Sequence, residues 1–312
     1  MMLADAQLEA FLQQLYSTPM PPASEIGAGA LREASAQRAL LRPRGSEMFE
    51  VVDLDPPSLG RTARLYRPLE GALPLALFLH GGGWVFGSLE THDRACRRLA
   101  AQSGWSVLSL DYRLAPESPW PAAVEDTWTA LGWIASAPAE LGPRPPLVAV
   151  MGDSAGGTLA ALACLRARDE DPSRMPDLQV LIYANTDLAD ESESLSSEGH
   201  GYGLEAVDIE WFTSQWVPDY ARRLDPRVSP LRAETLRGLC RTIVVTCEHD
   251  PLRDQGEAFA QRLRDEGVPV VMRREAGMVH NFLLWDLMSP ACAAAGERVA
   301  EDLRGFASSR TS

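Results

Sequence analysis

The chain has 312 residues, of which 46% are hydrophobic and 23% are charged, and its formal net charge is −14. This composition is typical of a globular protein with a full core and room for an enclosed site. The negative charge disfavours nucleic acid and anionic membrane surfaces as partners, because both would be repelled at long range. We therefore expect a small neutral molecule as the ligand.

The first residues and the apolar runs argue against a membrane protein. The segment Met1 to Gln14 carries Asp5 and Glu9 and lacks the basic start and apolar run of a secretory signal. The apolar run Ala72 to Leu79 is interrupted by Pro74 and is far shorter than the roughly 20 residues that span a bilayer. We expect a cytoplasmic protein without stable membrane insertion.

The cysteines are odd in number and scattered along the chain, with no CxxC pair and no histidine at metal-ligand spacing. We interpret them as small core residues or free thiols, and the sequence predicts no metal site. They are Cys96, Cys164, Cys240, Cys247 and Cys292.

Short apolar runs alternate with segments of helical period, a pattern that predicts an α/β fold with a mostly parallel sheet flanked by helices. The predicted strands are Leu75 to Leu79, Ser106 to Leu110, Leu147 to Met151, Gln179 to Tyr183, Thr242 to Thr246 and Val268 to Arg273, with Val51, Val52 and Leu54 as an antiparallel edge. The predicted helices are Ala6 to Tyr16, His92 to Ser103, Ala122 to Ala135, Gly156 to Arg168, Ala206 to Trp216, Gln255 to Glu266 and Ala291 to Phe306. Gly267 is predicted to stop the sixth helix.

Two segments fall outside this alternation. They are residues 1–50 and residues 185–229, the second of which begins acidic and serine-rich and then becomes aromatic. No Gly/Ser-rich linker and no repeat divides the chain. We expect one main domain, residues 51–184 and 230–312, under a cap formed by the N-terminal segment 1–50 and the inserted segment 185–229.

A serine lies between a predicted strand and a predicted helix, in the sequence Gly-Asp-Ser-Ala-Gly at residues 152–156. This order fits the nucleophile elbow, in which a sharp turn exposes a strained serine and the flanking glycines leave room for the turn. A bare match of five residues also arises by chance, and such a turn then only caps a helix. Ser154 is thus a candidate nucleophile that needs a second motif.

The second motif is His-Gly-Gly-Gly-Trp at residues 80–84, directly after a predicted strand. Backbone amides that bind an oxyanion must be free of crowding side chains, which adjacent glycines provide. The alternative is a flexible glycine turn. Because both motifs follow predicted parallel strands, we favour an oxyanion hole formed by the amides of Gly82, Gly83 and Ala155.

A serine hydroxyl needs a base near neutral pH, and the ordinary pKa of histidine suits that role. His280 follows the last predicted strand and so lies at the same sheet edge as Ser154. The alternative is a loop histidine without chemistry. The other four candidates are His80 in the glycine loop, His92 at a helix start, His200 in the expected cap and His249 directly before an acid.

The acid of such a triad lies between the serine and the histidine in chain order. Asp250 follows a predicted strand and so reaches the same edge of the sheet. Glu248 and Asp254 are its rivals, but Asp254 is expected to begin a helix, where a carboxylate favours the helix dipole without chemistry. We therefore predict that Asp250 orients His280.

At these residues the sequence resembles the hormone-sensitive-lipase-like group (family IV) of bacterial carboxylesterases, which have the α/β-hydrolase fold. The resemblance covers most of the chain from about residue 50 onward. It is carried by His80 to Trp84, Asp111 to Glu117, Gly152 to Gly157, Asp250 to Asp254 and His280.

The resemblance implies hydrolysis of short- to medium-chain carboxylic esters through an acyl-enzyme on Ser154, without cofactor or metal, under a helical cap. It also implies that Asp250 and His280 complete the triad. Family members are often dimers, so a homodimer is expected by analogy alone. Thr158 departs from the asparagine common after this elbow, which concerns helix packing more than catalysis.

Several aromatic and apolar residues could form the wall of a substrate pocket, but the same spacing is equally typical of core. They are Trp84, Phe86, Tyr202, Leu204, Trp211, Phe212 and Trp216. Two other functions stay open at this point. The same triad could hydrolyse an amide or remove an acetyl group, and a pocket could bind a small molecule without turnover. The complete set of serine, acid and histidine disfavours the second.

Overall fold

The computed structural model of the protein describes residues 2–19 and 21–311. Its strands are β1 Glu50–Leu54, β2 Ala63–Arg67, β3 Leu75–Leu79, β4 Ser106–Leu110, β5 Val148–Asp153, β6 Leu178–Ile182, β7 Arg241–His249 and β8 Val270–Val279. Its α-helices are α1 Ala6–Leu15, α2 Ala23–Ile26, α3 Ala28–Leu40, α4 Leu89–Ser103, α5 Ala122–Ala135, α6 Ala155–Glu170, α7 Glu193–Ser197, α8 Ala206–Trp216, α9 Arg253–Asp265 and α10 Pro290–Thr311. Short 3-10 helices are η1 Ala139–Leu141, η2 Pro172–Arg174, η3 Tyr220–Leu224, η4 Pro230–Arg232 and η5 Phe282–Leu284.

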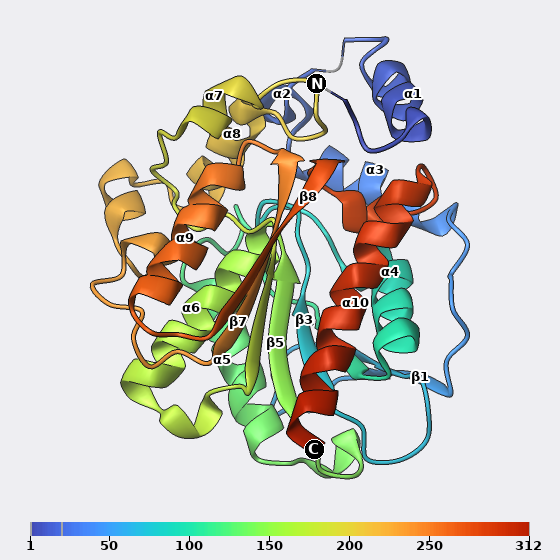
Figure 1. Ribbon diagram of the computed structural model, residues 1–312, viewed down its shortest axis with the longest axis vertical. Helices are drawn as coiled ribbons and strands as arrows, with labels where there is room; N and C mark the ends of the chain where they lie inside the picture. The colour runs from blue at the N-terminus through green and yellow to red at the C-terminus, as the bar shows by residue number, and fades with distance from the viewer. Residues whose placement is uncertain (1, 20, 312) are drawn as a thin grey trace.

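The described residues form one eight-stranded sheet in the order β1-β2-β4-β3-β5-β6-β7-β8 (Figure 1). β1 and β2 pair antiparallel, as do β2 and β4, whereas all neighbours from β4 to β8 run parallel. The predicted α/β class, the parallel centre and the antiparallel edge at residues 50–54 are confirmed. Parallel strands place their carboxyl ends at one edge, where ligands of open α/β sheets bind.

The central strands are buried on both faces, which explains why they form continuous apolar runs in the sequence. Along β3, Leu75, Leu77 and Leu79 contact the core on the side of α5, α6 and α9. Ala76 and Phe78 point to the other core, where α4 and α10 pack. This alternation follows from the two-residue period of a strand, which directs neighbouring side chains to opposite faces.

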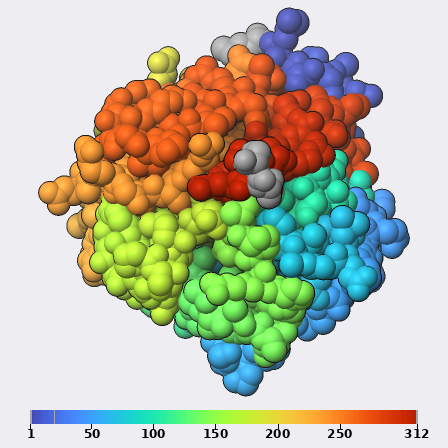
Figure 2. Space-filling model, turned by 60° about the horizontal axis from the view of Figure 1, so that its bottom comes forward, coloured from blue at the N-terminus to red at the C-terminus, as the bar shows by residue number. Residues whose placement is uncertain are grey.

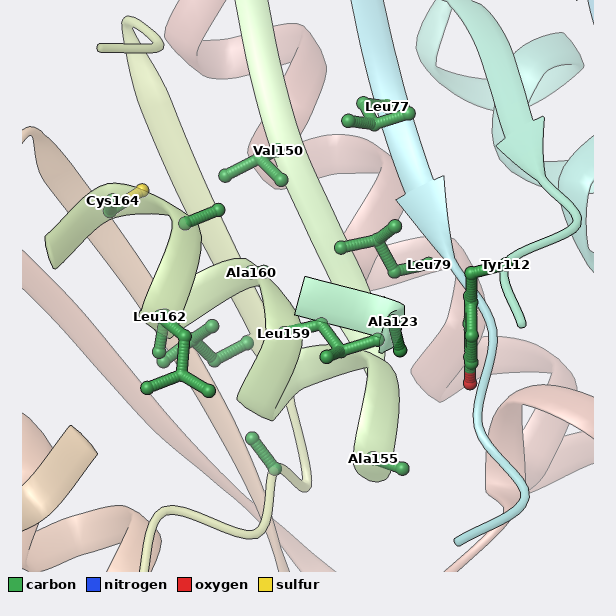
Figure 3. Close-up of a cluster of buried hydrophobic side chains, with 14 of the residues drawn as sticks. Leu77, Leu79, Tyr112, Ala123, Val150, Ala155, Leu159, Ala160, Leu162 and Cys164 are labelled. Atoms are coloured by element: carbon green, nitrogen blue, oxygen red, sulfur yellow. The ribbon is translucent and has the colours of Figure 1, made fainter. Parts of the chain in front are cut away.

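Helix α6 packs directly on the middle of the sheet. Figure 3 shows Leu159 and Ala160 of α6 close to Val150 of β5 and Leu79 of β3. All four side chains are small or branched aliphatic groups that let the helix approach the strands closely. Replacing a buried leucine such as Leu159 by alanine costs about 2–5 kcal/mol of stability, because the space is only partly refilled. This packing holds the start of α6 firmly at the end of β5.

Among the elements whose bounds differ from the predicted ones, two have identifiable reasons. Helix α4 begins at Leu89 and not at His92, because Ser88 and Thr91 form a capping box in which each side chain binds the other's backbone amide. Strand β8 continues to Val279, past the predicted end at Arg273, because its ladder with β7 extends across an irregularity near residues 247–249. Gly267 has φ +80°, consistent with the predicted stop after α9.

Helices α1, α2, α3, α7 and α8 lie at the end of the molecule toward which β7 and β8 point (Figure 1). These helices come from the N-terminal segment and the segment after β6. The opposite end comes forward in Figure 2, where the green middle of the chain occupies the lower part of the view and the dark-blue N-terminal segment lies at the upper rim. The division into a main domain and two cap segments stays a prediction.

All five cysteines are free, and four of them are buried, as predicted for core thiols. The Sγ atoms of Cys164 and Cys240 lie 3.9 Å apart, which is too far for a disulfide bond. Within residues 2–19 and 21–311, no helix has both the length and the apolar composition that a membrane crossing requires.

Candidate active site

Ser154 occupies the sharp turn between β5 and α6. Its φ of 53° and ψ of −121° are strained for a residue with a side chain. Its amide donates to Ile182 O at 2.9 Å, which ties the turn to β6. A Cβ at Gly156 would lie 1.9 Å from Leu79 O, and one at Gly152 would lie 2.3 Å from the carbonyl carbon of Gly156. The flanking glycines are therefore required by the close approach of backbone.

The structure brings Ser154, His280 and Asp250 together in one hydrogen-bonded series. Ser154 Oγ lies 3.1 Å from His280 Nε2, and His280 Nδ1 lies 2.8 Å from Asp250 Oδ2. The backbone amide of Leu252 donates to Asp250 Oδ1 at 2.8 Å, which fixes the carboxylate. His280 is 2% exposed and Asp250 is fully buried, so both groups work in a medium that strengthens their interaction. In the tautomer with its proton on Nδ1, the ring can accept a proton from the serine.

The other acids and histidines near these loops have different partners. Asp254 lies in the first turn of α9, where it accepts from the amide of Ser194 at 2.8 Å. Glu248 Oε2 accepts from the amide of Gly277 at 2.6 Å. His249 Nδ1 lies 3.1 Å from a carboxylate oxygen of Glu198. None of these contacts involves Ser154.

The glycine loop after β3 adopts backbone conformations that side chains rarely allow. Gly82 has φ +110° and Gly83 has φ +58°, and a Cβ at Gly83 would lie 2.4 Å from Cγ of Phe212. Among the described residues, the amides of Gly82, Gly83 and Ala155 donate to no acceptor. All three residues line the same cavity as Ser154. These amides are thus available to donate to an oxygen atom of a ligand. Ala155 is also the first residue of α6, where the helix dipole favours negative charge.

A buried polar cluster lies behind the glycine loop. Asp153 Oδ1 accepts from the amide of Gly81 at 2.8 Å and lies 3.3 Å from His92 Nε2. Burial raises the pKa of Asp153, but His92, His80 and the Gly81 amide outweigh it and hold the pKa below its ordinary value. Burial and the nearby His92 lower the pKa of His80 to about 3, so its ring, stacked on Tyr112, is neutral near pH 7. Sequence reasoning did not give Asp153 or His92 a role at this site, although Asp153 lies within the serine motif.

The cavity that contains Ser154 and His280 has a volume of about 610 Å³, within the range of small-molecule sites. Of the residues predicted for its wall, four line it. They are Trp84, Phe86, Leu204 and Phe212. The other three do not line it. Trp216 is buried and stacks on Trp84 with ring centroids 4.2 Å apart, Tyr202 stacks on His249, and Trp211 packs edge-on against Phe212. For these three, packing against neighbouring rings favours the core alternative.

Residues from the N-terminal helices complete the cavity, and the sequence pattern did not single them out. Phe11 and Leu15 of α1 and Arg38 of α3 contribute to the lining. Helix α1 is tied to the segment after β6 by Tyr16, whose hydroxyl donates to Glu205 at 2.6 Å. Thr158, where the group has asparagine, donates through Oγ1 to Asn185 O, a contact of helix α6 with the chain after β6. In the part of the chain that the structure describes, no group of three or more His, Cys, Asp or Glu side chains is arranged to hold a metal ion.

The sequence profile of a family described as alpha/beta hydrolase fold matches residues 76–284, which include every motif discussed above. The chain belongs to this family. The resemblance to the hormone-sensitive-lipase-like group is confirmed by this family match, together with relatives that are named as ester hydrolases.

The chain is 44% identical over 245 residues to the carboxylic ester hydrolase LipN of Mycobacterium tuberculosis, a match of 76% of this chain and 65% of LipN. It is 38% identical over 261 residues to the ethyl acetate hydrolase of Pseudomonas putida, covering 81% of this chain and 82% of that protein. Among solved structures, a hyperthermophilic esterase from the archaeon Pyrobaculum calidifontis superposes with a TM-score of 0.90 at 37% identity, covering 98% and 99% of the two chains.

Proposed function

We propose that this protein is a serine carboxylic ester hydrolase, with Ser154 as nucleophile, His280 as general base and acid, and Asp250 as the residue that orients His280. The observation that carries the proposal is the hydrogen-bonded series from Ser154 Oγ through His280 to Asp250 Oδ2. The names of the relatives, carboxylic ester hydrolase and ethyl acetate hydrolase, support esters as the substrate class.

In the first half of the reaction, Ser154 Oγ attacks the ester carbonyl carbon while His280 Nε2 takes the hydroxyl proton. Asp250 accepts from Nδ1, holds the ring in the tautomer that leaves Nε2 free, and stabilises the imidazolium that forms. The carbonyl oxygen becomes an oxyanion. His280 then gives its proton to the alkoxide as the carbon–oxygen bond breaks, which releases the alcohol and leaves the acyl group on Ser154.

In the second half, a water molecule takes the place of the alcohol. His280 accepts a proton from this water, and the resulting hydroxide attacks the acyl carbon. The second tetrahedral intermediate collapses, His280 returns the proton to Ser154 Oγ, and the carboxylic acid departs. The catalyst is restored without a metal or a cofactor in any step.

The oxyanion in both halves is proposed to bind the amides of Gly82, Gly83 and Ala155. Their lack of other acceptors supports this role, because an amide already in use could not stabilise a new charge. Removing one such donor in comparable sites costs about 100- to 1,000-fold in turnover, so the loop geometry is a large part of catalysis.

The cavity supports substrates of modest size. A volume of about 610 Å³, lined by Phe86, Leu204 and Phe212 near the glycine loop, suits short- to medium-chain acyl groups better than long lipid chains. We propose that residues 1–50 and 185–229 act as the cap that closes this cavity, because residues of α1, α3 and α8 line it. A cytoplasmic location and a homodimer also stay predictions.

The experiment is a turnover assay of the purified protein and of Ser154→Ala with p-nitrophenyl acetate, butyrate, octanoate and palmitate, with and without a chelator. We expect turnover of the shorter esters that is lost in Ser154→Ala and unaffected by the chelator. Equal and slow release by both proteins would contradict the proposal. Amide and acetyl-sugar substrates in the same assay identify amidase or deacetylase activity, and binding without turnover of any of them would identify a binding protein.

A further inference from the structure

Two arginines line the active-site cavity at the end of α3. Arg38 lies in the last turn of that helix, and Arg42 follows its C-cap residue Leu41. Ser35, one turn before Arg38, lines the same cavity. Both residues thus line the space that Ser154 also lines, Arg38 as an exposed and Arg42 as a half-buried residue, in a chain whose net charge is −14.

Neither guanidinium group has a hydrogen-bond or ion-pair partner among residues 2–19 and 21–311. Burial lowers the pKa of Arg42, and the carboxylate of Asp286 opposes this shift without forming an ion pair with Arg42. Asp286 is already engaged, because its Oδ2 lies 2.8 Å from Arg94 and 3.2 Å from Arg98. Neither Arg38 nor Arg42 therefore has a carboxylate of its own among the described residues.

The two carboxylates that line the cavity are, in contrast, occupied. Asp153 accepts from Gly81 and lies beside His92, and Asp208 accepts from the amide of Ala23 at 2.7 Å. Neither contacts Arg38 or Arg42. Both carboxylates that line the cavity thus have hydrogen-bond donors, whereas the side chains of the two lining arginines have no acceptor among the described residues.

The surroundings of Arg42 also disfavour its charge. Burial lowers its pKa, and the neighbouring cations Arg38 and Arg94 lower it further against the opposing effect of Asp286. Arg42 lies just beyond the end of α3, and the repulsion that it receives from Arg38 and Arg94 is only partly offset by Asp286. A bound anion would offset it, since guanidinium groups form strong charge-assisted hydrogen bonds with carboxylates.

We propose that Arg38 and Arg42 bind a carboxylate on the substrate, at a point remote from the ester bond that Ser154 attacks. The preferred substrates are then esters that carry a negative charge, such as half-esters of dicarboxylic acids, and not the neutral ligand expected from net charge alone. This inference rests on the proposed esterase function. The carboxylate belongs either to the acyl part or to the alcohol part of the ester.

The test compares substrates that differ only in that charge. For the acyl side, the pair is mono-4-nitrophenyl adipate and its methyl ester, with release of nitrophenol as the signal. For the alcohol side, the pair is 4-butyryloxybenzoate and its methyl ester. Each substrate is given to the wild type, to Arg38→Gln, to Arg42→Gln and to the double variant. Arg44→Gln is the matched control, because Arg44 is exposed and does not line the cavity.

In at least one pair, we expect the wild type to prefer the charged ester in kcat/KM. The double variant should lose about 10- to 100-fold of kcat/KM on that ester, mainly through a higher KM, and should lose much less on the neutral ester, so that the ratio of charged to neutral kcat/KM falls. Added salt should reduce the preference of the wild type, and Arg44→Gln should behave as the wild type. The substrate pair in which the wild type prefers the charged ester shows whether the carboxylate belongs to the acyl part or to the alcohol part.

No preference in either pair, or equal losses on charged and neutral esters, would overturn the inference. If the double variant does not fold, the wild type alone tests the inference, because a preference for the charged ester that salt does not reduce would overturn it. Failure of the proposed function is a different result, because the wild type would then hydrolyse the neutral esters no faster than Ser154→Ala.

Discussion

His92 and Asp153 form a buried pair directly behind the glycine loop, with His92 Nε2 3.3 Å from Asp153 Oδ1. The same carboxylate oxygen accepts from the amide of Gly81, the residue before the two glycines proposed to bind the oxyanion. Asp153 touches neither substrate nor the reacting atoms in the proposed mechanism. We therefore interpret it as a positioning residue that fixes the direction of the loop amides.

Asp153→Ala should lower kcat by about 10- to 100-fold with little change in KM, because the loop amides lose their alignment with the developing oxyanion. Asp153→Asn should recover part of this loss, since its Oδ1 can still accept from Gly81. The comparison is steady-state kinetics of both variants beside Asp126→Ala, a buried carboxylate that binds Arg113 away from the cavity. Equal kinetic losses in the Asp126 variant would show that general destabilisation is the cause.

Asp250→Asn should reduce kcat by about 10,000-fold while leaving the fold intact, because an amide favours the wrong tautomer of His280 and cannot stabilise its charged form. Asp254→Asn is the matched control, since Asp254 binds Ser194 and Arg253 instead. That variant should keep kcat within a few-fold of the wild type. If Asp254→Asn were the inactive variant, the assignment of the acid would be wrong.

The protonation of His80 links stability to pH. Burial, with His92, lowers its pKa from its ordinary value of 6.5 to about 3, so the unfolded chain binds a proton that the folded chain does not between those values. Stability from this group is fully present above pH 6.5 and is lost as the pH falls toward 3. His80→Gln should remove about 1.4 kcal/mol per pH unit from the slope of the unfolding free energy between pH 5.5 and 4.5. Urea titrations of both proteins measure this slope, and an unchanged slope would contradict it.

Phe212 and Trp211 are adjacent aromatic residues of α8, but only Phe212 lines the cavity. Phe212→Ala should enlarge the cavity beside Gly83 and raise the ratio of octanoate to butyrate turnover by about three- to tenfold. Trp211→Ala should leave that ratio within about twofold. Measuring kcat/KM for the p-nitrophenyl series with both variants checks this, and a larger shift in the Trp211 variant would place the acyl group elsewhere.

Most of the sheet could be predicted because its strands are buried on both faces and carry an unbroken apolar signal. β3 and β4 begin and end at the predicted residues. β2 was not predicted, since Ala63–Arg67 contains two arginines and so lacks an unbroken apolar run. Helix α3 was not predicted either, because none of its residues is buried and its sequence has no apolar stripe.

The triad could be predicted because each member follows a strand of the sheet and so reaches one edge, whatever lies between them in the chain. Arg38, Arg42 and His92 could not be placed at the site in this way. They join the cavity through the packing of α3 against α4 and of α4 against the sheet, and no local motif encodes that packing. The positions of the aromatic residues of α8 could not be predicted either. Helical spacing alone does not distinguish Phe212, which lines the cavity, from Trp216, which lies in the core.

The central claim is that Ser154 becomes acylated during turnover, and the most direct measurement is mass spectrometry of the intact protein and its peptides after reaction with a fluorophosphonate. The account predicts one adduct per chain, located on the peptide that contains Ser154, with activity lost in proportion to labelling. Ser154→Ala should carry no adduct at that peptide. Full esterase activity in a protein whose Ser154 stays unlabelled, or an adduct on a different serine that abolishes activity, would contradict it.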